Sequence, residues 1–287
     1  MTYASHLFVT FSIYALMGQS LVLAAGLGGM MSLAQAASLG VAAYSAGIIA
    51  TMVAGNIYLQ IFASTVLCLL FGWILSLSGA RHLGDSFILA SLAIQVLFQA
   101  IVTNWQSLTG GPLGLSGIPP ARIFGINISR AEDYAAAFCI WLLVSWASLW
   151  WLKKSHYSAA LCAASSDPIL ARSLGIGVRG IKSSALVICS LLMVIPGLLY
   201  ASYTRFLEPT AFSVSESILV LTVLIIGGQR SLGGVAAASA GLVLSIEALK
   251  AVGLPTAVAA NGRQVVFGIL LVLAVLFPRS SSKKSAL

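Results

Sequence analysis

The chain has 287 residues, of which 59% are hydrophobic and only 8% are charged. About a quarter of the residues in a soluble domain are charged, so this composition excludes an ordinary cytoplasmic enzyme and also a disordered or fibrous protein. A helix that spans a bilayer needs about 20 apolar residues. The sequence therefore predicts an all-α fold: a polytopic transmembrane helical bundle of about 8–10 spans, in a single domain that covers residues 1–287.

The net charge of +8 comes from 15 basic and 7 acidic residues. The basic residues are scattered in loops between apolar runs, which is typical of a membrane orientation signal and not of a nucleic-acid surface. The four cysteines lie mostly inside apolar runs, without CxxC spacing or histidine partners. We therefore expect no metal, no cofactor and no catalytic site. No small-residue cleavage site follows the first apolar run, so no removable signal peptide is expected.

Nine apolar runs are each about long enough to cross a bilayer. The stretch 29–54 is rich in glycine, alanine and serine, which favours a broken helix over one clean span, and the run 215–229 is short. In chain order the nine runs cover residues 6–26, 33–54, 57–78, 83–104, 132–152, 183–204, 215–229, 232–250 and 264–278.

Nine crossings place the two termini on opposite sides of the membrane. With the N-terminus outside and the C-terminus cytoplasmic, ten basic residues fall inside and five outside, as the positive-inside rule requires. The periplasmic loop is then about 105–131, and the largest cytoplasmic loop is about 153–182. The inner set is Arg81, Lys153, Lys154, Arg172, Arg179, Lys182, Arg230, Arg279, Lys283 and Lys284, and the outer set is Arg122, Arg130, Arg205, Lys250 and Arg263.

The cytoplasmic loop contains a short helix signal. Asp167 has the side chain of a helix cap and Pro168 suits the first helical position, so a helix is predicted over 168–174, ending at Gly175. Such a helix could lie on the lipid surface or dock into a groove on a cytoplasmic partner. The apolar contacts would come from Ile169, Leu170 and Leu174, which fall on neighbouring parts of the helix surface, while Ala171, Arg172 and Ser173 complete the segment.

Polar residues inside spans and a glycine-rich outer loop are the candidates for a substrate pathway. Gln95 and Gln99 are one helical turn apart, so they share a face that could line a pathway or hydrogen-bond a neighbouring helix, the second being the more common role. The loop TGGPLG could form a substrate entrance or an ordered turn that lets two helices pack. The pathway candidates are Gln35, Gln95, Gln99, Thr109, Gly110 and Gly111.

Five segments, in chain order, resemble those of one known family. They read LGGMMSLAQAASLGVAAYSA (27–46), TGGPLGLSGIP (109–119), ARSLGIGVRGIKSSALVICSLLMVIPGLLYA (171–201), SILVLTVLIIGGQRSLGGVAAASAG (217–241) and RQVVFGILLVLAVLFPR (263–279). Each is similar to the corresponding segment of the branched-chain amino-acid ABC transporter permeases. The chain departs from the family pattern at Gln35, often a histidine there, at Gln229–Arg230, and at its shortened ending Pro278–Arg279.

The resemblance implies an importer subunit in the bacterial inner membrane, in which 167–175 is the coupling helix on which the ATPase acts. It implies four kinds of partner: ABC ATPase subunits, a second homologous permease subunit, a periplasmic substrate-binding protein and membrane lipid. ATP would be hydrolysed by the ATPases and not by this chain. The cargo would be a branched-chain or related amino acid, and relatives in the family carry urea or short amides.

Two alternatives belong to other classes of protein. An inverted repeat between the two halves of the chain, or a carboxylate in mid-span, would favour an ion-coupled secondary carrier, and neither is evident in the sequence. An integral-membrane enzyme would need a cluster of acid–base or metal-binding residues, but the three histidines are dispersed near the ends of the predicted spans.

Overall fold

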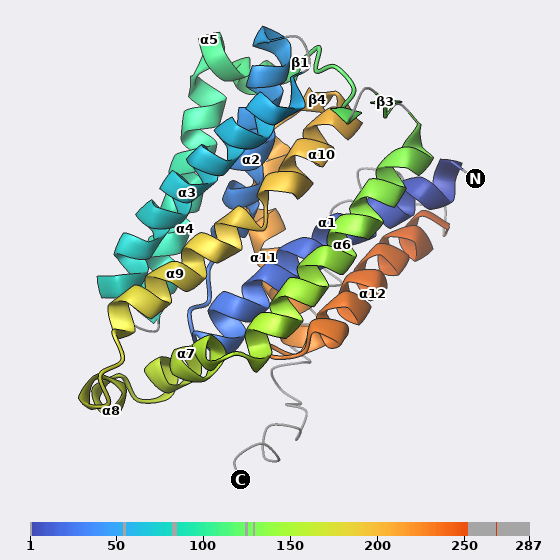
Figure 1. Ribbon diagram of the computed structural model, residues 1–287. Helices are drawn as coiled ribbons and strands as arrows, with labels where there is room; N and C mark the ends of the chain where they lie inside the picture. The colour runs from blue at the N-terminus through green and yellow to red at the C-terminus, as the bar shows by residue number, and fades with distance from the viewer. Residues whose placement is uncertain are drawn as a thin grey trace.

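The computed structural model describes residues 2–53, 56–81, 85–123, 126–128, 130–251 and 268. The chain forms an elongated bundle of helices, with helix α5 at one end and helix α8 at the other (Figure 1). We call these the α5 end and the α8 end. The ring of Tyr203, in the last turn of α10, packs tilted against the ring of His6 at a centroid distance of 5.6 Å, so the described N-terminal residues lie at the α5 end.

Six helical stretches are long and apolar enough to cross a membrane, and two shorter apolar helices follow them. Together they correspond to the first eight predicted runs, while the ninth, 264–278, lies outside the described residues except for Gly268. The helices are α1 (Thr2–Leu21) with the π-helix η1 (Val22–Leu27), α2 (Gln35–Met52), α3 (Ile57–Arg81), α4 (Asp85–Asn104), α6 (Ala131–Lys154), α9 (Val178–Leu191) with α10 (Val194–Thr204), α11 (Val214–Gly227) and α12 (Leu232–Ala251).

The second predicted span, 33–54, forms one uninterrupted helix, α2, so the broken helix expected for the stretch 29–54 is not observed. Residues 28–34 are not helical, and α2 begins only at Gln35. The chain turns at Gly29, which has a φ of +65° that favours glycine. The backbone N–H of Leu33 then donates to Ser91 Oγ of α4 at 2.9 Å, so a side chain replaces a missing helical hydrogen bond.

The predicted run 183–204, in contrast, is divided at Leu192 and Met193 between α9 and α10. Pro196 has no backbone N–H, so it removes the helical hydrogen bond to the carbonyl of Leu192. Helix α9 begins at Val178, earlier than expected, so the last residues of the predicted loop 153–182 belong to this helix.

The α5 end is built from short elements that the sequence analysis did not predict. Strand β1 pairs antiparallel with β4, with Leu115 opposite Leu207, and β2 pairs with β3. This pairing fastens the predicted loop 105–131 to the segment that follows α10. The elements are α5 (Gln106–Thr109), η2 (Gly111–Leu113), β1 (Leu115–Ser116), β2 (Arg122–Ile123), β3 (Ile126–Asn127), β4 (Phe206–Leu207) and η3 (Pro209–Phe212).

Two short helices lie at the α8 end, α7 (His156–Ser166) and α8 (Pro168–Ser173). Helix α8 occupies the predicted segment, but α7 was not expected. Its buried side chains are Ser158, Leu161 and Ala164. Because two of these three are small, the sequence has little of the apolar contrast that marks a packed helix face.

Large apolar side chains are exposed along α3, α4 and α6, whereas those of α1 and α2 are mostly buried. Trp73, Leu97 and Leu143, one on each of the three outer helices, are all more than half exposed. An apolar exterior around a buried central pair of helices is the arrangement of a multi-pass membrane protein, in which lipid covers the outer faces.

Candidate functional site

Helix α8 is capped as the sequence predicts. The carboxylate oxygen Oδ1 of Asp167 accepts hydrogen bonds from the backbone N–H groups of Ile169 at 2.9 Å and Leu170 at 3.0 Å. Pro168 occupies the first turn, where its missing N–H costs nothing. At the other end Gly175 has a φ of +82°, and the N–H of Ile176 donates to the carbonyl of Ala171 at 3.0 Å. The helix is therefore closed at both ends by local interactions.

Three apolar side chains at the tip of the α8 end have no cover within the described chain. Ile169 is 80% exposed, Leu174 69% and Leu170 57%. Ala171, in contrast, is buried with Ala164 of α7 and Val178 of α9, which holds the helix in place. Arg172 and Ser173 are exposed as well. We call Ile169, Leu170 and Leu174 the apolar tip.

Helix α7 lies between α8 and the non-helical segment 28–34. Gly29 approaches α7 so closely that a Cβ on it would lie 2.2 Å from Ser165 Oγ, and a Cβ on Gly28 would lie 3.4 Å from a methyl carbon of Leu161. On its other side α7 is tied to α9, because Tyr157 Oη lies 2.8 Å from Ser184 Oγ. Burial raises the pKa of this Tyr157 hydroxyl, so it stays protonated near neutral pH. A displacement of α8 would therefore reach segment 28–34 through α7.

A group of buried polar side chains surrounds the start of α2. Gln95 Oε1 accepts from the N–H of Ala37 at 2.8 Å and from Ser217 Oγ at 3.2 Å, while Gln95 Nε2 donates to the carbonyl of Phe212 at 2.7 Å. Ser217 Oγ also accepts from the N–H of Ala36 at 3.0 Å. Beside them, Gln35 Nε2 donates to Ser20 Oγ. We call the side chains of Ser20, Gln35, Gln95 and Ser217 the polar junction; all four are at most 3% exposed.

The polar junction joins the first turns of two helices, α2 and α11. The chain before α11 runs beside α2: Tyr44 Oη donates to the carbonyl of Leu207 at 3.2 Å, and Phe212 packs on Gly40. Because Gln95 is ten residues into α4 and nine from its end, the junction lies roughly 15 Å from either end of that helix. At this depth the free N–H groups of a helix start need protein partners, and Gln95 and Ser217 provide them.

The other pathway candidates lie apart from the polar junction. Gln99, one turn further along α4, is partly exposed and makes no hydrogen bond to any described residue. Thr109 Oγ1 donates to the carbonyl of Val102 at 2.6 Å and accepts from the N–H of Gly111 at 3.3 Å. Gly110 has a φ of +77°, and a Cβ there would lie 2.1 Å from the Gly114 carbonyl oxygen. These glycines therefore allow the positive φ and the close backbone contact that an ordered turn at the α5 end requires.

Sequence reasoning missed Ser20, Ser91 and Ser217. Serine is common in apolar helices and usually donates to its own backbone, so nothing in the sequence distinguishes these three. Only the proximity of segments far apart in the chain gives them their partners. Among the described residues, no group of three or more His, Cys, Asp or Glu side chains could hold a metal ion.

The bundle of apolar helices and the exposed capped helix at one end define a multi-pass membrane protein of the transport-permease class. The family described as "Branched-chain amino acid transport system / permease component" matches residues 3–275. The chain therefore belongs to this family, as its five quoted segments indicate.

Two curated relatives and one solved structure are similar to the chain. The high-affinity branched-chain amino acid transport system permease protein LivM of Escherichia coli (strain K12) is 25% identical over 261 residues, and its counterpart in Salmonella typhimurium (strain LT2) is 24% identical. Each alignment covers 83% of this chain but only 61% of the relative, so the chain spans less than two thirds of their length. A chain of PsaBC from Streptococcus pneumoniae in complex with Fab shares the fold, with a TM-score of 0.50 and 13% identity over 97% of this chain and 92% of that one.

Proposed function

We propose that the chain is the membrane-spanning permease subunit of an ATP-binding-cassette importer, and that its α8 is the helix on which a separate ATPase subunit docks. The observation that carries the proposal is the apolar tip. Ile169, Leu170 and Leu174 stay exposed on a helix whose cap and buried Ala171 fix it in place. A short rigid helix with an apolar face fits a groove on a soluble partner.

In this mechanism ATP-driven closure of the ATPases moves α8 and α7 together. The movement reaches Gly28 and Gly29, which contact α7, and then the polar junction at the start of α2. The first turns of α2 and α11 would separate or rejoin there, which alternates access to the two sides of the membrane. Our candidates for the substrate pathway remain the same six residues. Two lie in the polar junction, Gln35 and Gln95, and four lie further toward the α5 end, Gln99, Thr109, Gly110 and Gly111. The chain supplies no catalytic residue, because ATP is hydrolysed by its partners.

The proposed cargo is a branched-chain or related amino acid, on the strength of the family and of the relatives' names. An extracytoplasmic binding protein would deliver it at the α5 end, and a second, homologous permease subunit would complete the pore. The chain would thus work as half of a membrane channel and not as a carrier on its own.

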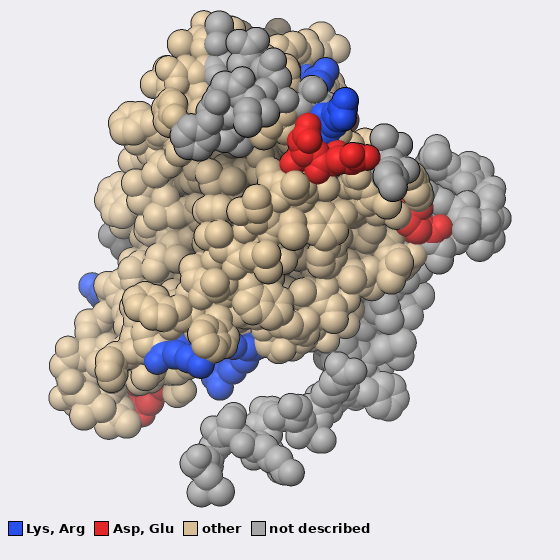
Figure 2. Space-filling model, turned by 45° about the vertical axis from the view of Figure 1, so that its right-hand side comes forward, with Lys and Arg blue, Asp and Glu red and all other residues tan. Residues whose placement is uncertain are grey.

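The proposed orientation places the α8 end in the cytoplasm of a bacterium, with the protein in the inner membrane. The charges support it. Figure 2 shows mostly basic side chains near the α8 end, with one acidic patch beside them, and acidic and basic side chains together toward the α5 end. On the described helices, the basic residues at the α8 end are Lys153, Lys154, Arg172, Arg179, Lys182 and Arg230, whereas Arg130 and Arg205 stand with Glu132, Asp133 and Glu208 at the α5 end.

Reconstitution tests the function. The chain is co-expressed with candidate ATPase, second permease and binding-protein subunits from the same organism, and the complex is placed in vesicles. We expect uptake of labelled leucine that needs both ATP inside and the binding protein outside, and unlabelled urea should not compete. Uptake driven by an ion gradient without ATP would contradict the proposal and support a secondary carrier.

A further inference from the structure

A second surface at the α8 end carries positive charge without compensation. It lies where the last turn of α6 meets the turn between α11 and α12 (Figure 1). Lys153 Nζ donates to the backbone carbonyl of Arg230, and Arg230 Nε donates to the carbonyl of Gly26 at 3.0 Å. Backbone oxygens, not carboxylates, therefore hold these two side chains in place.

The cations of this surface have no acidic partner. Within the described residues, neither Lys153, Lys154 nor Arg230 forms an ion pair with a carboxylate. Asp167, an acidic residue of the same end, uses its carboxylate to cap α8. Arg230 keeps its two terminal guanidinium nitrogens free for an added acceptor, since only Nε has a described partner. Helix α12 begins at Leu232, so the positive end of its dipole adds to the same place.

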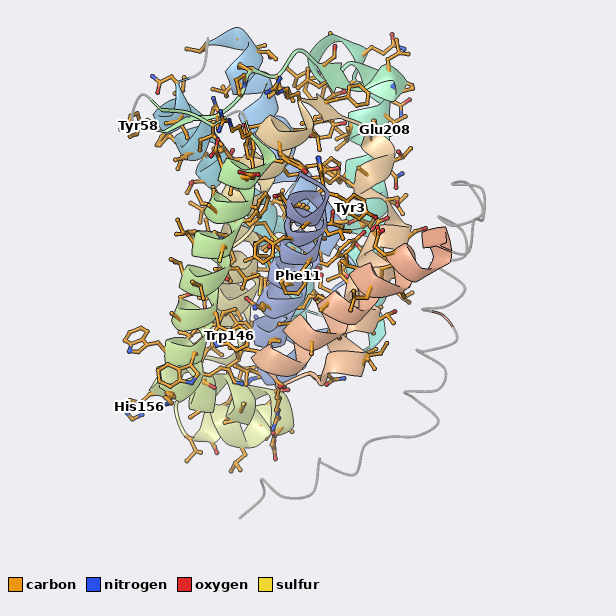
Figure 3. The ribbon with its side chains drawn as sticks, turned by 90° about the vertical axis from the view of Figure 1, so that its right-hand side faces the viewer. Tyr3, Phe11, Tyr58, Trp146, His156 and Glu208 are labelled. Carbon is orange, nitrogen blue, oxygen red and sulfur yellow. The ribbon has the colours of Figure 1, made fainter. Side chains whose placement is uncertain are left out.

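The neighbours of these cations are indole rings. Trp150 and Trp151 are 52% and 71% exposed in the last turn of α6. Lys154 Nζ lies 3.6 Å from the centroid of the Trp150 ring, which keeps the ammonium group close to the helix. Figure 3 shows Trp146 and His156 at this same lower end of α6. Exposed indoles at the end of a membrane-crossing helix are characteristic of the lipid headgroup level.

We propose that Lys153, Lys154 and Arg230, together with Trp150 and Trp151, bind the headgroup of an anionic phospholipid. The phosphate would accept from the Lys154 ammonium and the free guanidinium nitrogens of Arg230, and the indoles would pack against the glycerol and upper acyl chains. Exposed indoles favour a lipid as the occupant of this surface over a soluble protein. The proposed soluble partner, the ATPase, contacts the apolar tip of α8 instead.

Lipid at this surface would act on the permease itself. The turn that carries Arg230 rests on the π-helix below α1, where a Cβ on Gly26 would lie 1.8 Å from the carbonyl oxygen of Gln229. Because there is no spare room, a ligand that holds Arg230 also holds this turn against η1, next to segment 28–34. Anionic lipid is therefore expected to stabilise the folded bundle as well as to bind it.

The test compares lipid binding by the purified full chain and two single variants, using native mass spectrometry with phosphatidylglycerol or phosphatidylcholine added to the detergent. We expect the wild type to retain phosphatidylglycerol preferentially and to gain thermal stability from it. Lys154→Gln should weaken that retention about fivefold, because one basic residue near an anionic surface contributes about that factor. Arg179→Gln, which removes an exposed arginine of α9 at the same end, is the matched control and should bind as the wild type does.

Three results would overturn the proposal. The first is equal retention of phosphatidylcholine and phosphatidylglycerol. The second is an equal loss of lipid in Lys154→Gln and Arg179→Gln, which would mean a diffuse charge effect. The third is unchanged retention of phosphatidylglycerol in Lys154→Gln, which would mean that this surface does not hold the lipid headgroup.

Discussion

Gln95 is the residue on which the centre of the bundle depends. Its one amide bridges the backbones of α2 and of the segment before α11, through Ala37 and Phe212. Those partners are 58 and 117 residues away in the sequence. The sequence identifies Gln95 as an intramembrane polar residue that shares a face with Gln99, but the choice between a pathway and a hydrogen-bonding role depends on those distant partners. Contacts of this kind cannot be derived from local pattern.

Replacing Gln95 by leucine should destabilise the protein. The change keeps a similar volume but leaves the N–H of Ala37 and the carbonyl of Phe212 without a partner, and each buried unsatisfied group costs about 1–3 kcal/mol. Thermal unfolding in detergent measures the effect. Gln99→Leu, one turn along the same helix and without a described hydrogen bond, is the matched control and should unfold close to the wild-type temperature. If the two variants unfold alike, the bridging role of Gln95 is wrong.

An element can be predicted from the sequence when the interactions that form it join residues close together in the chain. Helix α8 is predicted because its cap, Asp167 with Pro168, lies within the segment itself. The break expected from local composition inside the second span is not found, because the small residues of α2 instead let this continuous helix pack closely inside the bundle. Helix α7 and the β1–β4 pair are missed, since the first buries mostly small side chains and the second joins two-residue strands that are far apart in sequence.

The contact between Gly29 and α7 connects α8 to segment 28–34 in the proposed mechanism, and a substitution can test it. Gly29→Ala should lower both stability and coupled transport, because the alanine would be strained at a φ of +65° and its Cβ would meet Ser165 Oγ at 2.2 Å. The backbone strain alone costs about 1–2 kcal/mol. Gly117→Ala, outside the coupling segment, is the matched control, with a φ of +80° but no atom within 4 Å of its Cβ.

Melting temperature and ATP-dependent uptake are measured on both variants. Gly29→Ala should be the worse of the two on each count, and adding Ser165→Gly should recover part of its loss, because that change removes the hydroxyl it meets. Equal behaviour of Gly29→Ala and Gly117→Ala, or no recovery in the double variant, would remove α7 from the proposed route.

For the whole molecule, apolar run length predicts the order of the eight apolar helical stretches among the described residues, and these stretches alternate in direction along the bundle (Figure 1). The proposed orientation can be measured by labelling single cysteines in a background that lacks the four native ones. Ser107→Cys on α5 and Ser173→Cys on α8 make a matched pair, since both serines are exposed. An impermeant maleimide should label position 107 in spheroplasts and position 173 only after the membrane is permeabilised. The reverse pattern would invert the topology.

The docking of an ATPase on the apolar tip of α8 is the central claim, and a pull-down of the ATPase by the affinity-tagged permease tests it most directly. Leu170→Asp places an unpaired carboxylate in the docking surface, a position that is 57% exposed and outside the fold's own core. Ala159→Asp adds the same charge at an exposed position of α7 and serves as the control. Both variants should reach the membrane in normal amounts.

We predict that Leu170→Asp retains about tenfold less ATPase per permease than the wild type and loses ATP-driven uptake, because burying an unpaired charge costs more than about 1.4 kcal/mol. Ala159→Asp should keep both. A helix that lies on lipid would instead show weaker membrane anchoring with the complex intact. Normal ATPase retention and normal transport in Leu170→Asp would contradict the coupling role of α8.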